Sequence, residues 1–213
     1  MPELSEFRLG AEVVDKDGRK AGTLACVLVD EDGFDPKELV VKDETSLVGR
    51  LMAGEKLMLT DEVVIPISAV ESASHDQVRL SIAASDVRKQ RPYISYRLKP
   101  ESLGEVILHE AQLLGGGLAF PDMDELANKP SSEIEIARDE NVMIGKTGRK
   151  LGKVHDLLYD QGELVGVVVR PEGLFKQDVV LPIRFLARSD DVALFADISE
   201  KDVEHLKPFV EPD

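Results

Sequence analysis

The sequence predicts an all-β protein, rich in strands with a few short helices, built as two small antiparallel β-barrels in tandem. The first observation is an internal repeat: residues 18–30 recur as residues 148–160 with a shared Gly-Arg-Lys-x-Gly frame and no gap. The second is spacing, since runs of about five β-branched and aliphatic residues are separated by turn residues about every 8–12 positions. This spacing is typical of a small barrel or sandwich.

Further segments repeat in the same order along the chain. Because several ordered matches do not arise by chance, we infer a duplication. We place repeat 1 at residues 8–87, a joining segment at 88–136 and repeat 2 at 137–206. The further matches are residues 39–42 with 167–170, residues 63–67 with 179–183, and residues 78–80 with 192–194.

Glycine, aspartate and proline stand at matching places in the two repeats. Glycine accepts the positive φ of tight hairpin turns, and a glycine just before a strand indicates a bulge or a close backbone approach. Proline cannot donate to a strand ladder, which places it at an edge or a bulge. We therefore assign structural roles to Gly18, Gly22, Asp30 and Pro66 in repeat 1 and to Gly148, Gly152, Asp160 and Pro182 in repeat 2.

Repeat 1 carries an insertion, residues 43–61, that repeat 2 lacks. The insertion is either an extra hairpin packed on its own barrel or an apolar surface that awaits a partner. We treat its apolar side chains as a candidate interaction surface, namely Leu47, Val48, Leu51, Met52, Leu57 and Met58.

The joining segment and the repeat ends contain the predicted helices. Residues 100–114 have apolar side chains at mixed spacing, which fits a helix and a strand equally. Residues 122–128 suggest one or two helical turns. Short helices are predicted at 85–90 and 199–206, with Ser85 and Ser199 as N-caps.

The composition limits which binding partners and which cellular location we expect. A net charge of −15 repels phosphate backbones and anionic lipid, so nucleic acid is not an expected partner. No apolar run approaches the about 20 residues of a membrane helix, so we expect no membrane span, while peripheral association stays open. The absence of a signal-like apolar N-terminus and the single cysteine, Cys26, fit a cytoplasmic protein.

Motifs that suggest chemistry are incomplete. Residues 144–147, Ile-Gly-Lys-Thr, end like a phosphate loop, but Asn141 stands where that loop requires glycine. The Asp-x-Asp-Gly stretches at 15–18 and 30–33 lack the final glutamate of a calcium loop and fit turns better. The histidines lie far apart in the sequence. We predict no catalytic residue, no cofactor, no metal site and no enzymatic activity.

The repeated residues resemble the PRC-barrel family, named for the cytoplasmic domain of the photosynthetic reaction centre H subunit. The family pattern is an apolar strand, a turn ending in glycine, x-x-x-Gly, an aliphatic strand ending in aspartate, a Val-rich strand, and a hydrophobic-Pro-hydrophobic strand. Gly18, Gly22 and Asp30 match it in repeat 1, followed by residues 40–41 and 65–67. The resemblance implies two PRC-type barrels and brings no catalytic residue with it.

The predicted function is a non-enzymatic protein-interaction or assembly module on duplicated PRC-barrels. Its partner is another protein or a second copy of the chain in a homodimer. The resemblance implies two alternatives: an accessory subunit of a photosynthetic or respiratory electron-transfer complex, similar to the H subunit, or a ribosome-associated factor, similar to the C-terminal domain of the ribosome maturation factor.

Overall fold

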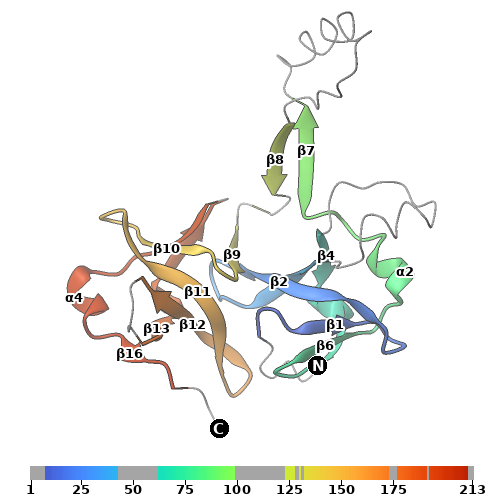
Figure 1. Ribbon diagram of the computed structural model, residues 1–213, viewed down its shortest axis with the longest axis horizontal. Helices are drawn as coiled ribbons and strands as arrows, with labels where there is room; N and C mark the ends of the chain where they lie inside the picture. The colour runs from blue at the N-terminus through green and yellow to red at the C-terminus, as the bar shows by residue number, and fades with distance from the viewer. Residues whose placement is uncertain are drawn as a thin grey trace, which may run out of the picture.

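The computed structural model describes residues 8–42, 62–98, 123–127, 130, 132–172, 177–190 and 192–210. Within these ranges the chain forms two seven-stranded sheets, a separate two-stranded ribbon and two short α-helices (Figure 1). The all-β class predicted from the sequence is therefore confirmed. The insertion at 43–61 and residues 100–114 lie outside the described residues.

The first sheet has the strand order β4-β3-β2-β1-β6-β5, and β9 pairs in addition with the second half of β2. The β1–β6 pair is parallel and the other pairs are antiparallel. Both faces of β2 are covered, because the consecutive residues Cys26, Val27, Leu28 and Val29 are all buried. This explains why the apolar run of β2 does not alternate. The strands are β1 (Glu12–Val14), β2 (Lys20–Asp30), β3 (Pro36–Lys42), β4 (Glu62–Pro66), β5 (Val70–Ala73), β6 (Gln77–Leu80) and β9 (Glu133–Ala137).

The second sheet has the order β14-β15-β10-β11-β12-β13-β16. In the reverse direction, and without β16, the order is β13-β12-β11-β10-β15-β14, which corresponds strand by strand to β4-β3-β2-β1-β6-β5 of the first sheet. The parallel pair is β10 with β15. The registers also match, since a bulge lies between Leu24 and Cys26 on β2 and between Val154 and Asp156 on β11. We call residues at matching positions of the two sheets equivalent. The strands are β10 (Asn141–Ile144), β11 (Arg149–Asp160), β12 (Glu163–Pro171), β13 (Val179–Pro182), β14 (Leu186–Ser189), β15 (Ala193–Ala196) and β16 (Lys207–Pro208).

The two predicted helices start differently from one another. Helix α4 (Glu200–Val203) has Ser199 as its N-cap, whose hydroxyl accepts the Asp202 N–H, so the predicted cap is confirmed. Helix α2 (Ala84–Val87) begins one residue before Ser85, so that predicted cap is wrong. The Ala84 N–H is instead accepted by Asp15 Oδ2 at 3.1 Å, because the β1–β2 turn brings a carboxylate to the helix start.

A two-stranded antiparallel ribbon, β7 (Ile94–Leu98) and β8 (Met123–Ala127), extends away from both sheets (Figure 1). The helical turn predicted for residues 122–128 is wrong, because β8 is extended and hydrogen-bonded to β7 along its whole length. A pairing with a distant segment here overrides the local preference of the sequence.

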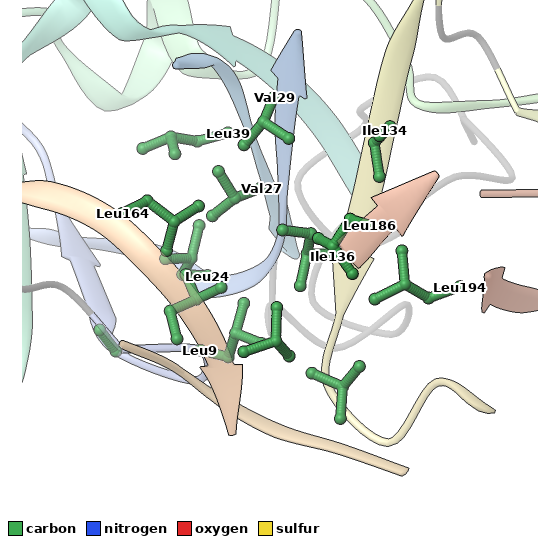
Figure 2. Packing of buried hydrophobic residues seen from close by; sticks show 14 of the residues in the cluster. Leu9, Leu24, Val27, Val29, Leu39, Ile134, Ile136, Leu164, Leu186 and Leu194 are labelled. Atoms are coloured by element: carbon green, nitrogen blue, oxygen red, sulfur yellow. The ribbon is translucent and has the colours of Figure 1, made fainter. Parts of the chain in front are cut away.

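One continuous hydrophobic core runs through both sheets. In Figure 2, Val27 and Leu24 of β2 lie beside Leu164 of β12. Ile136 of β9 lies beside Leu186 of β14. The sheets are therefore packed against one another, and β9 belongs to the first sheet by pairing while it also contacts the second. Each such buried aliphatic side chain contributes about 1.5–3 kcal/mol to the stability of the fold.

Candidate functional site

The predicted turn glycines shape the hairpins of the two sheets. Gly18 and Gly148 have positive φ values of 79° and 67° in the turns that lead into β2 and β11. At Gly22 and Gly152 a Cβ atom would lie 2.3 Å from the carbonyl oxygen of the neighbouring strand. Only glycine permits this close approach of two backbones.

The predicted aspartates and prolines lie at strand ends. Asp30 Oδ1 accepts the Gly33 N–H at 2.5 Å, and its other oxygen pairs with Lys37 Nζ at 2.9 Å. The Lys37 ammonium, together with the Gly33 N–H, lowers the pKa of the Asp30 carboxyl. Asp160 ends β11 and is exposed. Pro66 and Pro182 end β4 and β13, and each precedes a 3₁₀ turn, at Ile67–Ala69 and Ile183–Phe185.

The candidate interaction surface in the insertion, formed by Leu47, Val48, Leu51, Met52, Leu57 and Met58, lies outside the described residues. The equivalent faces of the two sheets differ in how far their apolar side chains are buried.

The face of the first sheet that points away from the main core is closed. Cys26, Leu28, Val40, Val64 and Tyr93 form a separate buried cluster there. The Tyr93 side chain is only 5% exposed, and its hydroxyl donates to Glu135 Oε2 on β9. Burial raises the pKa of the Tyr93 hydroxyl and of the Cys26 thiol, so both stay protonated.

The equivalent face of the second sheet is hollowed. Leu158, Val180 and Phe209 stand where the first sheet has Leu28, Val64 and Tyr93, but here all three side chains are only half-buried. They line a groove of about 680 Å³. The groove residues are Leu158, Val180, Pro182, Arg184, Phe185, Asp202, His205, Leu206, Lys207, Pro208, Phe209 and Val210.

The equivalence of Tyr93 and Phe209 rests on the backbone. The Tyr93 N–H donates to the Glu62 carbonyl oxygen at 2.9 Å, and the Phe209 N–H donates to that of Asp178 at 2.7 Å. Glu62 opens β4, and Asp178 immediately precedes β13. The two aromatic residues therefore occupy equivalent positions, each beside the edge strand of its own sheet.

The sequence itself contains a signal that Tyr93 and Phe209 are equivalent, and it extends past residues 87 and 206, where we ended the two repeats. The pattern Asp-Val, three residues, a basic residue, proline and an aromatic residue occurs at 86–93 and again at 202–209. Extending the repeat comparison past residues 87 and 206 finds it.

The rim of the groove is cationic, although the whole chain has a net charge of −15. Arg184 lies over the Phe185 ring at 4.9 Å, and within the described ranges neither Arg184 nor Lys207 forms an ion pair. Asp202, the carboxylate of the rim, already accepts the Ser199 hydroxyl at 2.6 Å. The groove thus combines an apolar floor with two cations that no carboxylate of the described chain neutralises.

Other candidate chemistry is engaged in turns. Asp15 is buried, and its Oδ1 accepts the N–H groups of Asp17 and Arg19 at 2.9 and 2.8 Å. The Gly-Lys-Thr stretch at 145–147 lies in the turn between β10 and β11. Among the described residues, no three His, Cys, Asp or Glu side chains gather in a way that could hold a metal ion.

None of the described helices is long and apolar enough to cross a membrane. The chain matches no family model and no curated protein. The geometry of the groove therefore carries the functional argument: an open apolar floor with a cationic rim can hold an apolar side chain and a carboxylate of a binding partner.

Proposed function

We propose that the protein is a non-enzymatic interaction or assembly module of tandem PRC-barrel type, and that it binds a protein partner in the groove of the second sheet. The strand order that occurs twice, with one parallel pair in each sheet, supports the barrel assignment. The Gly-x-x-x-Gly frame at the start of β2 and of β11 supports it further.

The observation that carries the proposal is the contrast between equivalent faces. The first sheet closes its face with Tyr93 and with β9, and buries Leu28 and Val64 almost completely. The second sheet leaves the equivalent Leu158 and Val180 half-buried in the groove. Exposed apolar surface that is rimmed by polar groups is typical of an interaction site.

The charge of the rim defines the partner. Arg184 and Lys207 attract a carboxylate, and the apolar floor accepts an aliphatic or aromatic side chain. The partner is therefore a protein segment that carries an apolar anchor residue next to an acidic residue. Since the ion pairs form at an exposed rim, we expect them to add selectivity and to weaken with salt.

Two exposed valines provide a matched test. Val210 is 77% exposed and lines the groove, whereas Val192 is 73% exposed and lies between β14 and β15, outside the groove lining. We would capture crosslinked partners from the native lysate and identify them by mass spectrometry. The baits are the full chain, Val210→Asp, Val192→Asp, Lys207→Glu and, as the charge control, Lys16→Glu.

The proposal expects at least one polypeptide that is recovered with the full chain, Val192→Asp and Lys16→Glu. The same polypeptide is reduced about tenfold with Val210→Asp and with Lys207→Glu, which corresponds to about 1.4 kcal/mol of binding free energy. Recovery that is equal for all baits, or no reproducible polypeptide at all, would overturn the groove as the binding site.

A further inference from the structure

The turn between β1 and β2 gathers positive charge. Lys16 and Arg19 are exposed in this turn. Arg79 lies on the neighbouring strand β6, and its guanidinium nitrogens lie 3.8 and 3.9 Å from the position that a Cβ atom on Gly18 would take. Its charge is therefore brought to the same turn. Within the described ranges, none of these three cations forms an ion pair.

The carboxylates of the same turn are not paired with these cations. Asp15 is buried, and its Oδ1 accepts the backbone N–H groups of Asp17 and Arg19. Its Oδ2 accepts the backbone N–H of Ala84 at the start of α2. Asp17 is exposed and forms no ion pair with any described residue. Asp15 thus binds backbone groups, and it holds the turn and the start of α2 together.

The equivalent turn of the second sheet shows what such cations bind. Lys146 Nζ lies 2.9 Å from Asp197 Oδ1, and Arg149 Nη1 lies 3.3 Å from Glu200 Oε1. Arg149 is the equivalent of Arg19, and Lys146 lies in the corresponding turn, residues 144–148. In this sheet the chain itself therefore supplies two carboxylates to the cations of the turn.

The first sheet lacks both of these carboxylates. The registers of the two parallel pairs, β1 with β6 and β10 with β15, align the segments that follow β6 and β15. Counting along both segments places Ser81 at the position of Asp197 and Ala84 at the position of Glu200. The first turn thus keeps the cations of the second turn without their intramolecular partners.

We propose that Lys16, Arg19 and Arg79 form a second docking surface, the basic surface, which binds a protein segment that carries two neighbouring carboxylates. These carboxylates take the places that Asp197 and Glu200 take in the second sheet. Arginine suits this role, because its planar guanidinium matches the geometry of a carboxylate. A protein segment is favoured over nucleic acid, because a chain with a net charge of −15 repels a phosphate backbone.

The basic surface is separate from the groove. Helix α2 meets the turn of the basic surface, and Asp202 of α4 lines the groove. The two helices lie at opposite ends of the molecule (Figure 1). The inference therefore goes beyond the proposed function and is independent of it. A module with two separate docking surfaces can bridge two partners.

Binding at the basic surface is measured best residue by residue. Exposed ion pairs are weak and are screened by salt, so we expect a modest affinity that falls as salt is added. The probe is a synthetic hexaglutamate peptide, titrated at low ionic strength into the full chain labelled with nitrogen-15. Saturable shifts of the backbone amide signals are expected at residues 16–19 and at Arg79.

An exchange of carboxylates between the two sheets gives the sharpest test. Ser81→Asp with Ala84→Glu gives the first sheet the intramolecular partners of the second. We expect the Kd of hexaglutamate at residues 16–19 to rise at least about tenfold in this variant. Both substitutions keep the backbone N–H groups, including the Ala84 N–H that donates to Asp15. Unchanged amide signals in the rest of the first sheet check that the variant is folded.

The reverse exchange and two single variants complete the test. Asp197→Ser with Glu200→Ala is expected to create saturable shifts at residues 146–149, which the unchanged chain does not show. Lys16→Glu is expected to raise the Kd at the basic surface about fivefold or more and to leave capture by the groove intact. Lys207→Glu is expected to do the opposite, so failure of one site is distinguishable from failure of the other.

Three outcomes would overturn the proposal. The first is that hexaglutamate gives no saturable shifts at residues 16–19. The second is that it binds there equally well after Ser81→Asp with Ala84→Glu. The third is that inorganic phosphate or a short oligouridylate shifts the same amides at lower concentration, because the basic surface would then select phosphate and not protein carboxylates.

Discussion

The Tyr93 hydroxyl donates to the Glu135 carboxylate and so joins the end of the first sheet to the strand that closes it. The Tyr93 backbone is hydrogen-bonded to Glu62, the first residue of β4. Glu135 lies on β9, 42 residues after Tyr93 in the chain. Phe209, the equivalent of Tyr93, has no hydroxyl, and its face of the second sheet is the open one. The Tyr93 hydroxyl is thus one feature, together with the strand β9, that distinguishes the closed face from the groove.

Tyr93→Phe is expected to destabilise the protein by about 1–3 kcal/mol, because a partly buried hydrogen bond to a carboxylate is lost while the carboxylate stays. Urea unfolding, followed by circular dichroism, measures the change. The matched control is Phe209→Tyr, which adds a hydroxyl to a half-buried ring and is expected to stay within about 0.5 kcal/mol of wild type. Equal stabilities of wild type and Tyr93→Phe would contradict this role of the hydroxyl.

We expect the stability of the fold to depend on pH through the buried carboxyl of Asp15. The backbone N–H of Arg19, together with those of Ala84 and Asp17, lowers the pKa of the buried carboxyl below its ordinary value. Because the pKa is lowered in the folded state, the carboxylate stabilises the fold at pH values above its ordinary pKa. This contribution is lost as the pH falls through the lowered pKa of the folded state. Asp15→Asn should therefore be less stable than wild type at neutral pH and should lose less stability on acidification.

Thermal unfolding at several values between about pH 7 and pH 2 measures both effects. Asp17→Asn in the same turn is the control, because Asp17 is exposed and donates to Asp15 through its backbone N–H, which the substitution keeps. Parallel pH profiles for wild type and Asp15→Asn would show that Asp15 has no such role.

Most strands of both sheets were predictable, because apolar runs and turn glycines are local signals. The pairing of β9 with β2 could not be predicted, because it joins residues more than a hundred positions apart. The Glu-Ile-Glu-Ile-Ala sequence of β9 contains no local signal for the strand with which it pairs. The strand β8 was mistaken for helix for the same reason. The groove is a difference between two equivalent faces, so it becomes visible only once both faces are built.

The two short helices offer a direct comparison of a true and a false N-cap. Ser199→Ala removes the hydroxyl that accepts the Asp202 N–H at 3.2 Å and is expected to cost about 1 kcal/mol. Ser85→Ala is expected to cost less than about 0.5 kcal/mol, because Ser85 lies inside α2 and is exposed. Urea unfolding of the two variants measures the difference, and a larger effect at Ser85 would argue against the helix start at Ala84.

Gly148 and Gly152, at the start of β11, are required for different reasons: the first for its backbone conformation and the second for a close backbone contact. In Gly148→Ala the new Cβ has no atom within 4 Å, so only the positive φ of 67° is penalised, by about 1–2 kcal/mol. In Gly152→Ala the new Cβ would lie 2.3 Å from the Arg170 carbonyl oxygen. Backbone atoms of β12 must then move, which is expected to cost about 3 kcal/mol or more. Urea unfolding of both variants checks the order, and a Gly152→Ala protein as stable as Gly148→Ala would mean that β11 and β12 do not approach this closely.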